Sequence, residues 1–155
     1  IGSEKFNKSV YIFTGISGFK FNPQGFYNGG WVDLQPLGTE GQGSFLYPER
    51  EKYKLFSIGI PIGVGYKLNL NSNLALNIAW SWTLTTTDYI DDVSLNYVNS
   101  NLLSEQAQNL ADKSFLGFSE GDQRGNSENM DKFGFFGVSL VYKIPKKTFC
   151  SQINY

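Results

Sequence analysis

The residues from Lys54 to Leu70 alternate strictly, and this alternation constrains the fold more than any other feature of the chain. Successive side chains of a β-strand point to opposite faces, so a period of two predicts a strand with two different faces. The odd positions from 57 to 69 are all small or polar. The even positions are all apolar and comprise Phe56, Ile58, Ile60, Ile62, Val64, Tyr66, Leu68 and Leu70. We therefore predict a two-faced strand over residues 54–70.

Three further segments have the residue types of long strands. Residues 74–86 repeat the alternation, and the preceding sequence, Asn-Ser-Asn at 71–73, has the composition of a tight turn. Residues 132–144 also alternate, with apolar residues at the even positions from 136 onward. Residues 9–21 are apolar at even and odd positions alike. They predict a strand, but they do not indicate which of its two faces corresponds to the apolar face of the other strands.

The length of these segments and the size of their side chains favour a membrane barrel over a soluble one. Strands of soluble proteins typically have about 5 or 6 residues, whereas these segments have about 13 to 17. At roughly 3.3 Å per residue and a tilt of about 40°, each would cross an apolar band of about 25 Å. A soluble barrel or sandwich would turn its bulky face inward. Here the small, glycine-rich face suits a narrow lumen, and the bulky face suits lipid.

Composition excludes helical membrane proteins and gives no reason to expect nucleic acid as a partner. A transmembrane helix needs about 20 consecutive apolar residues, but Gly, Ser, Asn or Lys interrupts every apolar run. An aromatic content of 16% and 17 glycines fit a barrel, whose strands alternate between lipid and lumen. A net charge of -1 provides no field that would attract nucleic acid.

The connections between the predicted strands alternate in length. Residues 22–53 and 87–131 are long connections, and residues 71–73 are a short one. Because outer-membrane barrels have long extracellular loops and short periplasmic turns, we expect both long connections to be extracellular and both chain ends to be periplasmic. Short strands are also predicted within the long connections, at 43–47 and 93–98.

Four long strands do not complete a membrane barrel. Single-chain barrels of this kind start at about eight strands, and unpaired strand edges would leave backbone groups unsatisfied in lipid. We therefore expect about four further strands to precede Ile1. Residues 1–155 would then be the C-terminal half of one all-β domain, an antiparallel, up-and-down transmembrane β-barrel. Residues 146–155 would form a periplasmic tail.

Few residues of the chain are candidates for catalysis. There is no His, and the lone Cys150 has only Lys146 and Lys147 as nearby cations, so arrangements that pair a nucleophile with His are unavailable. We predict no catalytic, cofactor-binding or metal-ligating residue. Because the periplasm is oxidising, Cys150 either forms an intermolecular disulfide or is a thiol without a role.

The acidic residues of the second long connection are the best remaining candidates for chemistry. They are Asp88, Asp91, Asp92, Asp122 and Asp131. Paired carboxylates can transfer protons or bind a hard cation such as calcium, although this spacing does not match an EF-hand. The alternative, which we prefer, is that these acids cap turns and pair with Arg124 inside a folded loop.

Four segments in the connections occur in the same order as in a known family. They are residues 18–23 (GFKFNP), 34–43 (LQPLGTEGQG), 87–94 (TDYIDDVS) and 121–125 (GDQRG). Together they resemble the PorG-like family, outer-membrane β-barrels of the type IX protein secretion system. The resemblance runs from about Phe13 to Lys143. It implies structural rather than catalytic roles in the loops for Thr39, Glu40, Asp88, Tyr89, Asp91, Asp92, Asp122 and Arg124.

The resemblance also implies a function and partners. Family members are eight-stranded barrels of the bacterial outer membrane, too narrow to conduct protein. The chain would then be a non-enzymatic component that anchors or organises the secretion machinery. Its partners would be outer-membrane lipid and other secretion subunits, above all the periplasmic ring lipoprotein. The periplasmic face available for this contact would comprise residues 1–8, residues 71–73 and the tail from Pro145.

Two other functions remain open at this stage. The first is a small outer-membrane pore or small-molecule-binding barrel with a polar lumen, lined by Ser57, Lys67, Asn77, Ser81 and Lys143. The second is an enzyme with a surface carboxylate site, which would require Asp91 and Asp92 to converge with other acids.

Overall fold

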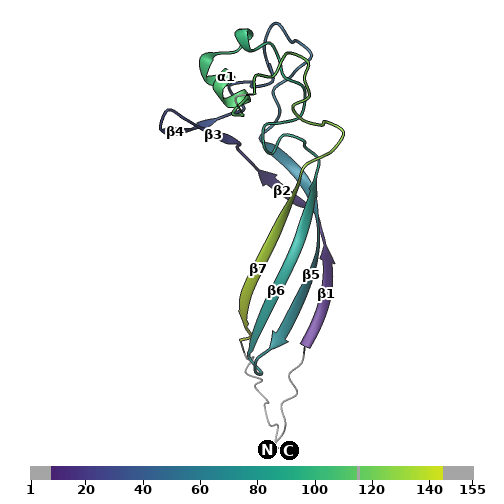
Figure 1. Cartoon of the computed structure of the whole chain (residues 1–155). Helices are drawn as coiled ribbons and strands as arrows, with labels where there is room; N and C mark the ends of the chain where they lie inside the picture. The colour runs from purple at the N-terminus through teal and green to yellow at the C-terminus, as the bar shows by residue number, and fades with distance from the viewer. Residues whose placement is uncertain (1–7, 115, 145–155) are drawn as a thin grey trace, which may run out of the picture. The chain divides into compact units, whose positions relative to one another are not determined.

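The structure, a computed structural model, describes residues 8–114 and 116–144, and its regular elements are mostly β-strands (Figure 1). The elements are β1 (Lys8–Thr14), β2 (Ser17–Lys20), β3 (Gln24–Tyr27), β4 (Gly30–Asp33), β5 (Phe56–Asn69), β6 (Leu74–Thr85), the 3₁₀ turn η1 (Ser100–Leu102), α1 (Glu105–Ala111) and β7 (Lys132–Tyr142). One sheet has the order β1-β5-β6-β7, and β2 also pairs with β5. Strands β3 and β4 form a second, two-stranded sheet. The fold of the described residues is therefore of the antiparallel, all-β class.

The chain divides into two compact units, which we describe separately. The strand unit comprises, among the described residues, 8–14, 61–82 and 134–144. The loop unit comprises residues 15–60 and 83–133 without residue 115. The long strands β5, β6 and β7 each contribute residues to both units.

Three of the four predicted long strands are confirmed with nearly the predicted bounds. Strands β5, β6 and β7 correspond to the predictions at 54–70, 74–86 and 132–144. The predicted turn between β5 and β6 is also present. Its Asn71 carboxamide oxygen accepts hydrogen bonds from the backbone N–H groups of Asn73 (2.9 Å) and Leu74 (2.8 Å), which is the geometry that makes Asn common in turns.

The fourth predicted strand, at 9–21, is wrong as one continuous strand. It is divided into β1 and β2, which pair with β5 in a single register, from Thr14 opposite Ile62 to Ser17 opposite Gly59. The stretch of β5 skipped between these pairs contains Pro61. Because proline has no backbone N–H to donate to a sheet ladder, the pairing is interrupted at this point.

The pairing of β1 with β5 identifies the two faces that the sequence left unassigned. Tyr11 lies opposite Gly65, and Phe13 lies opposite Gly63. A Cβ atom at Gly65 would collide with the Tyr11 ring, and one at Gly63 would lie 2.6 Å from Cε1 of Phe13. The rings of Tyr11 and Phe13 therefore cover Gly65 and Gly63 of β5. The side chains at the even positions of β1, among them Ile12, fall on the opposite face.

That opposite face of the strand unit is apolar and exposed. Side chains on all four of its strands contribute to it, with exposed fractions that reach 86% for Ile12 on β1 and 67% for Phe136 on β7. The set comprises Val10, Ile12, Ile62, Val64, Tyr66, Trp80, Trp82, Phe136, Val138, Leu140 and Tyr142. We call this set the apolar face.

The sheet is open among the described residues, where β1 and β7 are its terminal strands. The closed barrel expected from the sequence is thus not formed by residues 8–114 and 116–144 themselves. None of the helices in these ranges is long and apolar enough to cross a membrane.

The loop unit contains a β-hairpin and a capped helix that the sequence analysis missed. Strands β3 and β4 form a hairpin whose turn residues, Asn28 and Gly29, both have positive φ angles (47° and 85°). Asn-Gly is the favoured pair for such a turn. Helix α1 is capped by Ser104, whose hydroxyl accepts a hydrogen bond from the Ala107 N–H at 3.2 Å. Leu110 of α1 packs onto Gly25 of the hairpin, where a Cβ atom would lie 2.6 Å from the leucine.

The two short strands predicted in the long connections are wrong. Residues 43–47 form turns, and within 93–98 only Asn96 has a β-type pairing, an isolated bridge to Gln123. Backbone groups in both segments bond instead to other parts of the loops, as in the Gly43 N–H to Arg50 C=O hydrogen bond of 2.7 Å.

Candidate functional site

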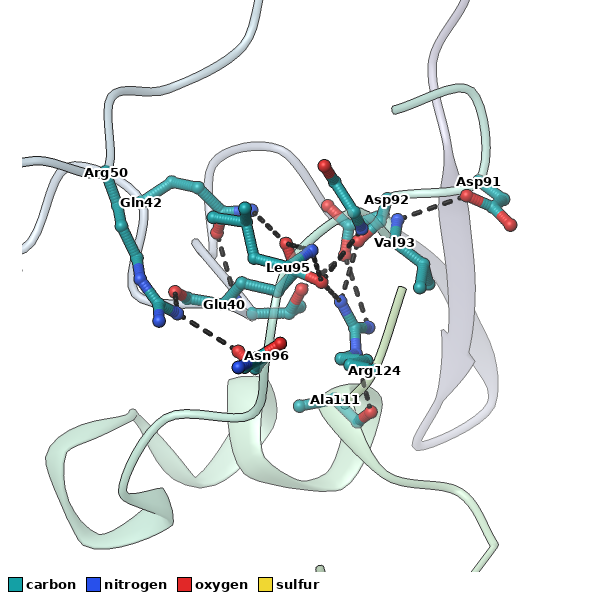
Figure 2. A network of polar contacts seen from close by, with 12 residues as sticks. Glu40, Gln42, Arg50, Asp91, Asp92, Val93, Leu95, Asn96, Ala111 and Arg124 are labelled. Atoms are coloured by element: carbon teal, nitrogen blue, oxygen red, sulfur yellow. Dashed lines mark hydrogen bonds and ion pairs between the residues drawn. The ribbon is translucent and has the colours of Figure 1, made fainter. Parts of the chain in front are cut away.

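Three loops of the loop unit converge on a buried ion-pair network (Figure 2). Arg124 Nη1 lies 2.9 Å from Glu40 Oε1, and Arg124 Nη2 lies 3.7 Å from Asp92 Oδ2. The side chains of Glu40 and Asp92 have no solvent exposure, and that of Arg124 is 6% exposed. Each of these residues comes from a different one of the segments 34–43, 87–94 and 121–125. We call Thr39, Glu40, Tyr53, Asp92 and Arg124 the three-loop network.

Glu40 is anchored mainly by backbone donors. Its carboxylate accepts hydrogen bonds from the N–H groups of Ser94 (3.0 Å) and Leu95 (3.1 Å), besides the Arg124 guanidinium. Gln42 adds a longer contact from its side-chain amide at 3.4 Å. Burying a carboxylate is costly unless it is paired and hydrogen-bonded, and Glu40 meets both conditions.

Asp92 is held by two hydroxyl groups as well as by Arg124. The hydroxyl of Thr39 donates to Oδ2, and the hydroxyl of Tyr53 donates to Oδ1 at 2.6 Å. Burial raises the pKa of the Asp92 carboxyl, while the two hydroxyl groups and the Arg124 charge act in the opposite direction. Burial and the bond to Asp92 also raise the pKa of the Tyr53 hydroxyl. The Tyr53 hydroxyl therefore keeps its proton and donates it to the hydrogen bond with Asp92.

The two arginines of this region tie the loops together through carbonyl groups. Arg124 donates to the backbone oxygens of Asp92 at 2.7 Å and Ala111 at 3.2 Å. Arg50 donates to the backbone oxygens of Glu40 at 2.7 Å and Asn96 at 3.0 Å. A guanidinium group has five N–H donors in a rigid fork, which suits it to joining several segments at once.

The other predicted loop residues lie around this network without joining its ion pairs. Asp91 is exposed and accepts a hydrogen bond from the Val93 N–H at 3.1 Å (Figure 2). Asp122 accepts one from the Ser119 N–H at 2.8 Å. Tyr89 stacks on Tyr53 with ring centroids 4.5 Å apart. Asp91 and Asp122 thus cap turns, whereas Asp92 pairs with Arg124.

Two of the expected acidic residues lie near one another without forming a metal centre. Asp131 accepts a hydrogen bond from the Ile90 N–H at 2.7 Å, and Asp88 is buried near it. In the ranges that the structure describes, no three His, Cys, Asp or Glu side chains are placed to hold a metal ion. Cys150, for which we predicted either an intermolecular disulfide or no role, lies outside the described residues.

Sequence reasoning missed Tyr53, Arg50 and Gln42 as members of this region. Gln42 lies within the segment 34–43 but has no role assigned there, and Tyr53 and Arg50 lie outside all four of the segments. Arg50 and Tyr53 lie in the segment just before β5, and they bond to Asn96 and Asp92 much later in the chain. The sequence separation between Tyr53 and Asp92 alone is 39 residues.

Comparison with protein families, curated proteins and solved structures finds no match to this chain.

Proposed function

We propose that this chain is part of a β-barrel in a bacterial outer membrane and serves there as a non-enzymatic component of the type IX protein secretion machinery. In this role it anchors or organises the periplasmic ring subunits, including the ring lipoprotein. The observation that carries the proposal is the apolar face of the strand unit. The resemblance of four loop segments to the PorG-like family supplies the link to secretion.

The apolar face supports a lipid environment because of its extent and regularity. Soluble monomers expose scattered apolar residues, and contiguous patches above a few hundred Å² mark an interaction surface. Here Val10 and Val138, on the two terminal strands, are 70% and 60% exposed, and Trp80 on an inner strand is 51% exposed. Alternation of an apolar outward face with a small or polar inward face is the signature of membrane barrel strands.

The contacts of the three-loop network support a structural role for the loop unit. Its charged groups bind backbone atoms and one another in a buried position, which holds three distant segments in a single arrangement. Catalytic acids and bases instead need access to a substrate. A rigid loop unit suits a component that positions other proteins.

The membrane part of the proposal is tested by the migration of the full-length protein on a gel after detergent extraction from outer membranes. A closed barrel resists detergent until it is boiled, so we expect two bands whose proportions change with heating. A single unchanging band, with the protein in the soluble fraction, would overturn this part.

The secretion part is tested separately in cells. We expect that deleting Lys146 to Tyr155, together with replacing the turn at 71–73, reduces both co-purification of the ring lipoprotein and export of type IX substrates. Replacement of Gly30 by alanine in the β3–β4 hairpin is the control, because a Cβ atom there meets nothing within 4 Å. Normal ring assembly and export in the first variant, with the protein still in the outer membrane, would overturn the secretion role alone.

The pore alternative is separated by single-channel recording in planar bilayers. On the inward face the Tyr11 and Phe13 rings cover glycines, and the Tyr11 hydroxyl donates to Asn77 at 2.8 Å. Side chains that fill the inward face in this way leave no open channel through the barrel. We therefore expect no conductance steps from the wild-type protein.

A further inference from the structure

The end of β2 and the start of β5 flank an open cavity of about 570 Å³, which we call the Lys20 cavity. Lys20 lies directly opposite Phe56, and the Phe21 N–H donates to the Leu55 carbonyl at 3.2 Å, so strand pairing sets most of the wall. The volume is typical of pockets for organic groups, which have about 300 to 1,000 Å³. The lining residues, all in the loop unit, are Lys20, Phe21, Asn22, Lys54, Leu55 and Phe56.

The charge of the cavity wall is positive. Lys20 and Lys54 are the charged residues of the lining, and both are exposed. Over the part of the chain that the structure describes, neither ammonium group has a hydrogen-bond or ion-pair partner. Asp33 is bonded to Asn22 of the lining, but its Oδ1 atom already accepts amide hydrogen bonds from Asn22 at 2.8 Å and Gln24 at 2.6 Å. Two free cations in one wall favour an anionic occupant.

Two other lysines of the loop unit differ from this pair because their ammonium groups are already bonded. Lys52 donates to the Pro36 carbonyl at 3.0 Å, and Lys113 donates to the Phe26 carbonyl at 2.9 Å. Lys20 and Lys54 thus keep all three of their N–H donors available for a ligand.

The rest of the wall is mostly apolar and leads into a row of exposed apolar side chains. Phe56 is 54% exposed, and Ile58 and Ile60, which follow it on the same face of β5, are 49% and 50% exposed. A small inorganic anion gains nothing from such a surface, whereas a hydrocarbon chain is stabilised when both it and the surface are removed from water. Cations beside an apolar row match a molecule with an anionic head and a hydrocarbon chain.

We infer that the Lys20 cavity binds the phosphate group of an anionic membrane lipid, held by Lys20 and Lys54, with the hydrocarbon chain running from Phe56 toward Ile58. Lysine side chains at a membrane surface pack their methylene stems on apolar groups and direct the ammonium group at lipid phosphates. The inference rests on the membrane part of the proposed function, to which it adds a class of lipid and a place of binding.

Native mass spectrometry of the full-length protein in a neutral detergent tests this inference. The probe is short-chain phosphatidic acid, and phosphatidylcholine with the same chains is its counterpart without net charge. We expect phosphatidic acid to bind at least about tenfold more tightly, because two lysines attract its phosphate. Inorganic phosphate at the same concentration should not displace it, because free phosphate has no hydrocarbon chain to place on the apolar row.

Three double variants locate the binding site. Lys20→Gln with Lys54→Gln should lower affinity for phosphatidic acid about tenfold or more. Lys52→Gln with Lys113→Gln is the matched control, because it removes the same charge from the same unit, and it should change the affinity less than about twofold. Lys20→Arg with Lys54→Arg keeps both cations and should bind within about threefold of the wild type. Heat-dependent migration on a gel verifies that each variant is folded.

Several results would overturn the inference while leaving the proposed function in place. They are equal affinities for the two lipids, an equal loss in the glutamine variant and its control, and displacement of the lipid by inorganic phosphate, which would assign the cavity to a free anion. In each case the heat-dependent migration of the wild-type protein would still identify a barrel. A protein without such migration, recovered in the soluble fraction, would instead overturn the membrane part of the proposed function and this inference with it.

Discussion

The strand unit and the loop unit place polar and apolar groups in opposite ways. In the strand unit the bulky apolar side chains are exposed, and the fully buried side chain on β6 is that of the small Ala75, with 0% exposure. In the loop unit the largest fully buried side chains are Glu40, Thr39 and Asp92. One unit thus exposes what a soluble protein buries, and the other buries what a soluble protein exposes.

The contrast indicates that the two units depend on different forces. The apolar face of the strand unit is stabilised when it is removed from water, at roughly 25 cal/mol per Å². The three-loop network depends on the mutual geometry of buried charges, and a buried charge without its partner is strongly destabilising. Substitutions in one unit should therefore leave the other largely unaffected.

The largest effect should follow from Arg124→Leu. This substitution leaves Glu40 and Asp92 buried without their cation, which should reduce the free energy of unfolding of the loop unit by about 3 to 5 kcal/mol. Hydrogen exchange in the loop segments at 34–43 and 87–94 should accelerate, whereas exchange in β5 and β6 of the strand unit should change little.

A double variant sharpens this prediction. Glu40→Met combined with Arg124→Leu removes a charge of each sign, so it should recover part of the stability lost in Arg124→Leu alone. If the stability losses of Glu40→Met and Arg124→Leu, each measured by hydrogen exchange, simply add up in the double variant, Glu40 and Arg124 do not stabilise each other.

The next largest effect should come from an arginine on the apolar face. Val138 and Ser139 are neighbours on β7 and point to opposite faces of the strand. If the apolar face contacts lipid, Val138→Arg should destabilise the full-length protein in bilayers by up to about 2 to 4 kcal/mol, and Ser139→Arg should have a much smaller effect. Urea unfolding in lipid vesicles measures both. Equal losses in the two variants would contradict a lipid-facing Val138.

A smaller effect is expected where the rings of β1 cover the glycines of β5. Gly65→Ala places a methyl group against the Tyr11 ring, and overpacking of this kind costs about 1 to 3 kcal/mol. Gly134→Ala is the matched control, because its Cβ atom would lie 3.4 Å from Trp82, an ordinary contact. Thermal unfolding should show a lower midpoint for the first variant only. Combining Gly65→Ala with Tyr11→Leu should restore part of the loss.

The strands of this protein could be predicted wherever one face of a strand differs from the other. This condition holds for β5, β6 and β7, and their bounds followed from the period of two. It fails for residues 9–21, because Tyr11 and Phe13 are as apolar as Val10 and Ile12. Only the pairing of β1 with β5 places Tyr11 and Phe13 opposite glycines. The break in the strand pairing arises from Pro61 in the partner strand β5, so no residue within 9–21 indicates it.

The loop unit could be predicted much less well, because its contacts join segments far apart in the chain. Arg124 and Glu40 are separated by 84 residues, and no local pattern specifies that they meet. The segments at 34–43, 87–94 and 121–125 contain Glu40, Asp92 and Arg124, but nothing in their sequences indicates which of these residues pair. The β3–β4 hairpin is different, since Asn28–Gly29 is a local signal that could have been recognised.

The smallest effect concerns the pH dependence of the loop unit. Because burial raises the pKa of Asp88 above its ordinary value of 3.8, the folded state keeps a proton that the unfolded state has already released. The contribution of Asp88 to the free energy of unfolding is therefore largest at low pH. It falls as the pH rises from 3.8 through the folded-state pKa, and above that it stays at its lower value.

Asp88→Asn removes this titration, and the variant should gain stability relative to the wild type as the pH rises from 4 to 7. One proton limits the difference in slope to about 1.4 kcal/mol per pH unit. Asp92 and Asp131, whose pKa values are also raised by burial, should leave a residual slope of the same sign. Hydrogen exchange of residues 121–125 at several pH values measures the effect, and Asp91→Asn, at an exposed acid, is the control. If Asp88→Asn and Asp91→Asn gave the same profile, burial of Asp88 would not be the cause.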